Sequence, residues 1–325
     1  MAAALLGAIT TACGGTAASA AGTSASGTGR SKSGHTARSK RAASTSAAAG
    51  SSAALRASWP TYPQLLPAAT GTGPTPGFVP AVRWQGQTAA WVARTSSGLG
   101  LLSFDQRFLT LHLHAGAGDP GGSGWRYGPS IAGAERHALA AAFNGGFKFS
   151  TGPGGFESYG RVAVAPQTGL GSIVTYSDGT TDIGAWNQGV PAAGRQVASV
   201  RQNLTLLIDH GVVRSNASCL LCWGATLGGV IDPARSALGV TADGHLIWVG
   251  GEHLTVSALA SALLAARVVR AVELDINPEW VNAYLYGHRG GRGPLAPVPV
   301  VPGQNGVPGE FLAPWGRDFF SVVGR

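Results

Sequence analysis

The sequence predicts an α+β fold, in which a single domain contains mostly antiparallel, twisted sheets and a few packed helices. Three observations support this fold class. Apolar residues alternate with polar ones on both sides of short turns, which is typical of β-hairpins. Only two segments have the apolar spacing of a helix, and no internal repeat is present.

Three hairpins are predicted, over residues 173–183, 237–249 and 204–213. The first two turn at an Asp-Gly pair and the third at Asp-His-Gly, and glycine supplies the positive φ angle that tight hairpin turns require. Further strands are expected at residues 90–93, 109–114, 271–276 and 319–323.

Two helices and one long loop complete the expected fold. Ser130 is placed to cap a short helix over residues 133–142, and Thr255 to cap a longer one. One stripe of the longer helix carries Val256, Leu259, Leu263 and Leu264. Residues 287–308 are rich in Gly and Pro, so we expect a surface loop there.

The chain divides by composition into three parts. Residues 1–13 are a short apolar run, residues 14–56 are almost entirely Ala, Ser, Thr and Gly, and residues 57–325 can form a core. The middle part lacks the apolar surface needed to offset its chain entropy, so we expect a disordered linker. Because no positive residue precedes the apolar run, we expect the natural start to lie upstream.

The net charge of +8 comes mostly from this linker. It holds six of the 23 basic residues and no acidic one, which leaves 17 basic against 15 acidic residues in 57–325. The positive linker is expected either to be attracted to an anionic membrane or wall surface, or to serve simply as a solvated spacer. We expect no nucleic-acid binding, because no RNA- or DNA-binding motif accompanies the charge.

The cysteines indicate export. Residues 9–13 resemble a bacterial lipobox in which Cys13 is lipidated, although an ordinary signal peptide with a chance cysteine is the alternative. Cys219 and Cys222 form an even pair, for which a small disulfide is favoured over a thioredoxin-like redox site. A structural zinc site is not expected, because no further pair of ligands follows. The expected location is therefore extracellular, or a lipid-anchored position on a bacterial cell envelope, with the lipid as the sole membrane contact.

Three groups of residues are candidates for chemistry. Asn144-Gly145-Gly146 brings backbone and an amide close to a ligand, or it is an ordinary helix stop. Arg235 opens an apolar strand and is suited to grip a phosphate, or it forms a plain salt bridge. Glu273 and Asp275 lie two apart on one strand, where paired carboxylates need a partner or a cation.

Taken in order, four segments resemble the phosphodiester glycosidase family, the domain type of the uncovering enzyme. These segments are Asn144 to Phe147, Leu206 to Gly211, Arg235 to Gly244, and Thr255 to Asp275, and the resemblance covers about residues 140–286. It implies an exported glycosidase that hydrolyses a sugar-1-phosphodiester bond in a cell-envelope glycoconjugate. The sugar, the aglycone and the oligomeric state are not predicted.

The resemblance suggests roles for the candidate residues. Arg235 and Lys148 would bind the phosphate, Asp275 with Glu273 would serve the attacking water or the sugar cation, and Asn144 would orient sugar hydroxyls. A calcium ion beside the acids is the only cofactor considered.

One segment departs from the family pattern. The glycine-rich loop expected after Asp275 is replaced by Ile276-Asn277-Pro278-Glu279-Trp280, in which Asn277 and Glu279 could restore some lost contacts. A bulky Trp280 there would reshape the pocket. Two alternatives therefore stand beside the hydrolase: a non-catalytic envelope protein that binds a carbohydrate or an anionic glycopolymer, and a redox protein built on Cys219 and Cys222.

Overall fold

A computed structural model describes residues 62–66, 77–152, 154–219, 222–224, 229–288 and 294–325. All of them belong to one compact unit, residues 58–325. The expected signal segment 1–13 with Cys13, and the expected linker 14–56, lie outside the described residues. No helix among the described residues combines the length and the hydropathy needed to cross a bilayer.

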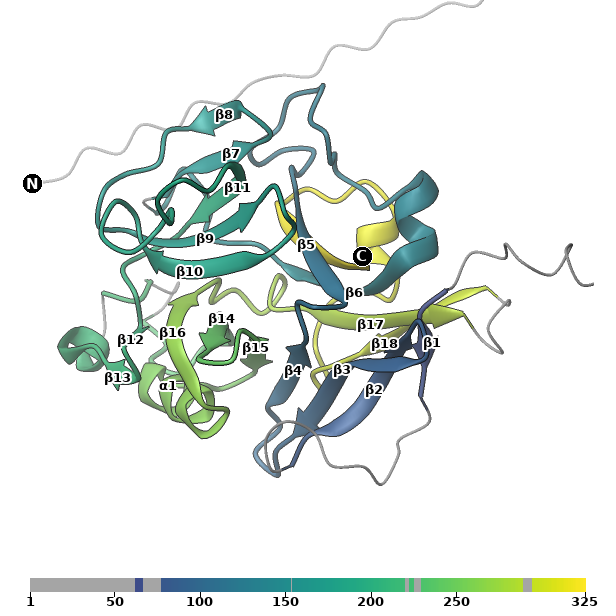
Figure 1. Ribbon diagram of the computed structural model, residues 1–325. Coiled ribbons are helices and arrows are strands. Elements are labelled where there is room, and N and C mark those ends of the chain that lie inside the picture. The colour runs from purple at the N-terminus through teal and green to yellow at the C-terminus, as the bar shows by residue number, and fades with distance from the viewer. Residues whose placement is uncertain (1–61, 67–76, 153, 220–221, 225–228, 289–293) are drawn as a thin grey trace, which may run out of the picture. The chain divides into compact units, whose positions relative to one another are not determined.

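The described strands form three sheets, and every ladder between named strands is antiparallel (Figure 1). The largest has nine strands in the order β1-β2-β3-β4-β15-β14-β16-β12-β13. Their bounds are β1 Gln64–Leu65, β2 Val79–Trp84, β3 Gln87–Arg94, β4 Gly100–Phe104, β15 Leu246–Gly251, β14 Arg235–Thr241, β16 Val268–Glu273, β12 Ile208–Asp209 and β13 Val212–Val213.

The other two sheets have five strands each. The order in the second sheet is β10-β9-β11-β7-β8, and in the third it is β18-β17-β6-β19-β5. The second sheet contains β10 Thr181–Ala185, β9 Gly171–Tyr176, β11 Val197–Gln202, β7 Phe156–Ser158 and β8 Arg161–Val164. The third contains β18 Leu295–Pro299, β17 Ala283–His288, β6 Leu139–Asn144, β19 Phe319–Gly324 and β5 Leu109–His114.

The helical content is small. The α-helix α1 (Val256–Ala265) packs on β14, β15 and β16, and its N-terminus is capped by the Thr255 hydroxyl, which accepts a hydrogen bond from the Ala258 N–H. Three 3₁₀ turns, at Gly133–Ala138, Ser215–Ser218 and Glu310–Leu312, are the other helical elements described. The prediction of mostly antiparallel sheets is confirmed, whereas the α+β label fits loosely.

Most predicted strands are confirmed. The hairpins β9–β10 and β14–β15 form where Asp-Gly turns were expected, and the third hairpin is limited to the short β12–β13. Strands β3, β5 and β19 also lie where the sequence predicts them, whereas β16 begins three residues before the strand predicted at 271–276 and ends at Glu273. The capped helix is confirmed as α1, although its Leu264 is 37% exposed and lies off the buried stripe.

Two expectations are wrong. The helix predicted over 133–142 ends as a 3₁₀ turn at Ala138, and residues 139–144 form β6, which is buried between β17 and β19. Ser130 does not cap the turn, whose N-cap residue is Ala132. The surface loop expected over 287–308 contains the end of β17 and all of β18. Its prolines are compatible with a strand because β18 lies at the edge of the sheet, where a missing N–H donor is tolerated.

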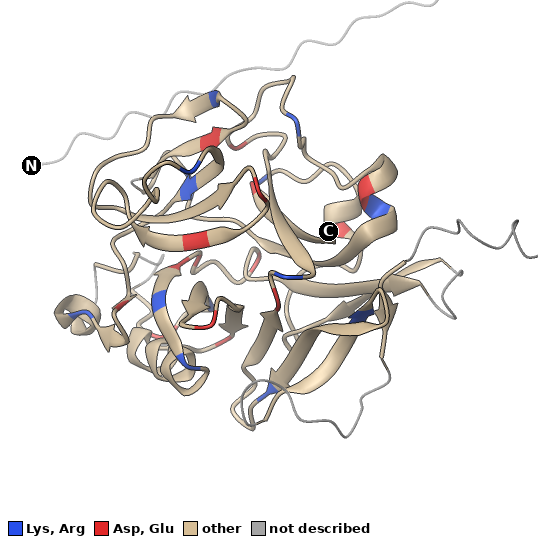
Figure 2. Ribbon diagram, in the orientation of Figure 1, with Lys and Arg blue, Asp and Glu red and all other residues tan. Residues whose placement is uncertain are grey.

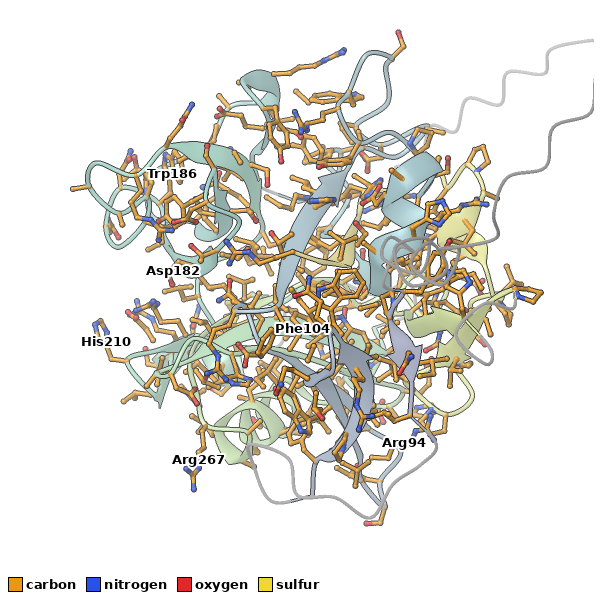
Figure 3. The ribbon with its side chains drawn as sticks, turned by 45° about the vertical axis from the view of Figure 1, so that its right-hand side comes forward. Arg94, Phe104, Asp182, Trp186, His210 and Arg267 are labelled. Atoms are coloured by element: carbon orange, nitrogen blue, oxygen red, sulfur yellow. A yellow bond between two sulfur atoms is a disulfide. The ribbon has the colours of Figure 1, made fainter. Side chains whose placement is uncertain are left out.

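The three sheets share one apolar core. Phe143 of β6 packs on Phe104 of β4 and on Trp248 of β15, and the same cluster includes Ile173 of β9. Phe104 lies in the interior, whereas His210 and Arg267 point outward (Figure 3). Both charge signs are scattered over the ribbon of this unit (Figure 2).

Candidate functional site

The candidate site lies where ends of strands from the three sheets meet. Asn144 is the last residue of β6, Asp275 follows β16, and Arg317 precedes β19. Asn144 Nδ2 donates to Ser236 Oγ (2.9 Å), and the Ser236 N–H donates to the Asp275 carbonyl (2.9 Å). These bonds join β6 of the third sheet to β14 and β16 of the first.

The Gly145-Gly146 segment is fixed by side chains from two sheets. Asp318 Oδ2 accepts from the Gly146 N–H (3.2 Å), and Asn203 Oδ1 accepts from the next N–H along the chain (3.1 Å). A Cβ atom on Gly145 would overlap Asp318, and one on Gly146 would overlap Asn203. The two glycines are therefore required by close packing of this segment.

A buried ion pair between Arg201 and Asp318 stabilises the Gly145-Gly146 segment. Arg201 of β11 donates from Nε to Asp318 Oδ2 (2.7 Å) and from Nη2 to Asp318 Oδ1 (3.2 Å), and neither side chain is exposed. Arg201 Nη2 also donates to the Phe147 carbonyl (2.6 Å). The second sheet thus holds the third sheet's Gly-Gly turn through a bidentate arginine.

Arg235 and Glu273 are paired with each other. Arg235 Nη1 donates to Glu273 Oε1 (2.6 Å) and to the Trp223 carbonyl (3.0 Å), while Nε donates to the Leu254 carbonyl (2.8 Å). Glu273 is fully buried, and this burial raises the pKa of its carboxyl group despite the guanidinium. With its donors directed to Glu273 and to carbonyl groups, Arg235 cross-links β14 and β16 within the first sheet.

Asp275, the second of the two predicted acids, has a different environment from Glu273. Its Oδ1 accepts from the backbone N–H groups of Ile276 (2.7 Å) and Asn277 (2.9 Å), and its Oδ2 lies 3.7 Å from Arg317 Nη2. Burial raises the pKa of Asp275 to about 6, although those N–H groups and Arg317 act to lower it. The carboxyl group is therefore poised to change its protonation near neutral pH.

Arg317 has one donor, Nε, that the described part of the fold does not use. Its Nη2 donates to the Gly146 carbonyl (2.7 Å), and its Nη1 lies 3.3 Å from Asp119 Oδ2. Within the part of the chain that the structure describes, buried Nε and Nη1 have no aligned hydrogen-bond acceptor. Because Nη1 faces the Asp119 carboxylate, Nε is the donor without a partner among these residues, and a buried guanidinium N–H of this kind is suited to bind an oxyanion.

The segment after Asp275 covers this arginine. The Arg317 guanidinium carbon lies 4.4 Å from the centre of the Trp280 ring, and the Lys148 ammonium lies 4.5 Å from it. Asn277 accepts from the Glu279 N–H (2.9 Å) and so stabilises this turn. Lys148, Arg317 and Asp275 are thus brought together around Trp280.

Two buried polar atoms without hydrogen-bond partners in the described structure lie beside the Gly145-Gly146 turn. Asn144 Oδ1 and Asn203 Nδ2 are buried, and neither has a hydrogen-bond partner in the described structure. Both residues flank the Gly145-Gly146 turn through the contacts given above. Buried unpaired acceptors and donors at one turn are consistent with a site that binds a polar ligand.

Sequence reasoning missed Arg317, Asp318, Arg201 and Asp119. The only available signal was the Arg-Asp pair placed directly before the predicted strand at 319–323.

The calcium expectation gains no support from the carboxyl groups. Glu273 is paired with Arg235, and Oδ1 of Asp275 is held by backbone donors. Among the described residues, no group of three or more His, Cys, Asp or Glu side chains is placed to hold a metal ion.

Cys219 and Cys222 are joined by a disulfide, with their Cα atoms 5.4 Å apart. The bond follows the 3₁₀ turn Ser215–Ser218 and closes a small loop next to buried Trp223. The small disulfide that the spacing of the two cysteines favoured is therefore confirmed.

Comparison with known proteins gives only a distant likeness in fold. No family model matches the chain, and no curated protein matches it. The fold is similar to the catalytic domain of zebrafish N-acetylglucosamine-1-phosphodiester alpha-N-acetylglucosaminidase, auto-inhibited by its pro-peptide, with 14% identity, a TM-score of 0.43, and coverage of 81% of this chain and 87% of that one. A hypothetical protein from Synechocystis is also similar, with 14% identity, a TM-score of 0.37, and coverage of 74% and 63%. A Burkholderia pseudomallei K96243 protein described as exported has 12% identity, a TM-score of 0.35, and coverage of 75% and 77%.

Proposed function

We propose that this protein is an exported hydrolase that cleaves a sugar-1-phosphodiester bond in a cell-envelope glycoconjugate. One observation carries the proposal: Asp275, a carboxyl group with a pKa of about 6, lies beside a buried arginine whose Nε donor has no partner among the described residues. The motif resemblance and the Cys219–Cys222 disulfide agree with an exported enzyme of this kind.

The proposed roles follow from the contacts. Arg317 binds the phosphate through Nε, and Lys148 adds a second positive charge next to Trp280. Asn144 Oδ1 accepts a hydrogen bond from a sugar hydroxyl group. Arg235 and Glu273, which the sequence suggested for phosphate binding and catalysis, hold two strands in register instead.

The reaction then needs one base. A water molecule attacks the anomeric carbon, and its proton moves to the Asp275 carboxylate. The bond from the anomeric carbon to the phosphate oxygen breaks, and its electron pair leaves with the phosphate. The phosphate is already a good leaving group, so stabilisation of its charge by Arg317 matters more than protonation.

The full-length protein tests this proposal. Release of free sugar from methyl phosphodiesters of α- and β-hexose 1-phosphates is measured for the wild type, for Asp275→Asn and for Asp209→Asn. Asp209 pairs with exposed His210 in the β12–β13 hairpin, so its variant is a matched control. We expect turnover to be lost only in Asp275→Asn; equal turnover in both variants would exclude Asp275 as the base.

A second candidate is a non-catalytic protein that binds a carbohydrate or an anionic glycopolymer. It is favoured by the burial of the acid, since Asp275 is only 3% exposed and Arg317 only 7%. Binding of the same phosphodiesters without sugar release, by both the wild type and Trp280→Ala, would favour this candidate. Sugar release by the wild type would reject it.

A further inference from the structure

A surface of aromatic and basic side chains lies beside the β7–β8 hairpin. It consists of Trp125, Arg126, Tyr127, Tyr159 and Arg161, which we call the aromatic–arginine surface. The Arg126 guanidinium lies 4.4 Å from the Tyr159 ring centre, and the Arg161 guanidinium lies 4.1 Å from that of Trp125. Tyr127 packs edge-on against Tyr159, with ring centres 5.7 Å apart.

Tyr159 occupies a backbone position that does not suit it. Tyr159 (φ 51°) and Gly160 (φ 77°) form the two-residue turn between β7 and β8, because Ser158 pairs with Arg161. Turns with two positive φ angles favour Asn-Gly, and a bulky aromatic residue in this conformation costs free energy. The side chain is nevertheless 43% exposed, so it is not held there to fill the core. Residues kept in such strained positions are commonly functional.

The charge of the surface has no internal partner. Neither Arg126 nor Arg161 takes part in any ion pair among the described residues, whereas Arg195 of the same sheet region pairs with Asp178. Arg161 donates one hydrogen bond, to the Ser123 carbonyl. Arginines that lie on aromatic rings without a carboxylate can still bind an anion through their edges.

One loop links this surface to the candidate site. Residues 115–128 carry Asp119, which faces Arg317, and then Trp125 at the surface. The start of the loop is tied to the segment that carries Arg317, since the Ala117 N–H donates to the Trp315 carbonyl (2.8 Å). The same loop therefore contacts Arg317 and contributes Trp125, Arg126 and Tyr127 to the aromatic–arginine surface.

We propose that the aromatic–arginine surface binds further units of an extended anionic glycan whose phosphodiester occupies the Arg317 site. Sugar rings stack on Tyr159, the exposed aromatic residue of this surface, and phosphate groups between sugars contact Arg126 and Arg161. The inference rests on the proposed function, because it assigns that site a polymeric substrate.

Binding as a function of ligand length tests the inference. The probes are phosphodiester-linked hexose oligomers of one, two and four sugars, and a neutral hexose tetramer. Affinities for the full-length Asp275→Asn protein are measured calorimetrically, so that no probe is cleaved during titration. We expect the charged tetramer to bind at least roughly tenfold more tightly than the single unit, with a gain that falls as salt is raised.

The key variant is Tyr159→Asn in the same background. Asparagine fits a positive φ angle better than tyrosine, so the variant should not lower the melting temperature. We expect it to lose most of the tetramer's gain, and Arg126→Gln to lose the salt dependence. Arg83→Gln, which changes an exposed arginine on β2, is the control and should match the parent.

The outcomes separate the two proposals. Unchanged tetramer affinity in Tyr159→Asn, or equal binding of the neutral tetramer, would overturn the inference while leaving binding of the single unit, and with it the proposed function, intact. Loss of the length gain only in the surface variants would support it. Failure of every phosphodiester probe, including the single unit, would reject the proposed function and with it this inference.

Discussion

The environment of Asp275 predicts an unusual dependence of stability on pH. Its pKa is raised from 3.8 to about 6 by burial, so the folded protein holds this proton more tightly than the unfolded chain. The free energy of unfolding should therefore fall as pH rises from about 4 to about 6. A shift of about two units corresponds to a loss of roughly 3 kcal/mol.

Asp275→Asn removes this titration and keeps the amide oxygen that accepts from the Ile276 and Asn277 N–H groups. We expect the free energy of unfolding of the variant, relative to wild type, to increase by roughly 3 kcal/mol between pH 4 and pH 7. Urea unfolding of both proteins at several pH values measures this difference, in which the other titrating groups cancel. A relative stability that stays constant across this range would refute the description of Asp275 as a buried carboxyl group with a raised pKa.

Three further predictions follow from the same contacts. If Asp275 is the base, kcat/KM should rise with pH through about 6 and level off above it, because the carboxylate form is needed; a pH–rate profile that falls over this range would contradict the assignment. Gly146→Ala should lower the free energy of unfolding by about 1–3 kcal/mol, since its Cβ overlaps Asn203, whereas Gly128→Ala meets open space and should change it by less than about 0.5 kcal/mol; chemical denaturation of both variants checks this. Arg235→Met should cost about 3–5 kcal/mol, because it leaves Glu273 buried and unpaired, and the double variant Arg235→Met/Glu273→Leu should recover part of this in the same measurement; a double variant no more stable than the single one would argue against a buried ion pair.

The parts of the fold that the sequence revealed are those whose pattern is local. The Asp-Gly turns and alternating residues of β9–β10 and β14–β15 specify hairpins within a dozen residues. By contrast, β6 reads as a helix because Ala140, Ala141 and Ala142 favour one, and burial between β17 and β19 leaves no alternation to detect. Tertiary packing overrides propensity in that strand.

About half of the residues of the candidate site could be predicted from the sequence. Asn144, the two glycines after it and Asp275 stand out because polar or flexible residues interrupt apolar segments. Arg317 lies in no pattern, and only the pairing of β19 with β6 brings it to Gly146. For the same reason, the sequence suggested that Arg235 binds a phosphate. In the structure its partner is Glu273, on the neighbouring strand of the β14–β16 ladder.

The position of β19 has a consequence for how the site comes into being. This strand pairs with β5 and β6, which precede it by about two hundred residues, and closing so long a stretch of chain is slow and entropically costly. A chain that has formed its local hairpins but not this long-range pairing has Asp275 without Arg317. Binding at the proposed site would therefore require complete folding, so partly folded or misfolded molecules in a preparation should contribute nothing to it.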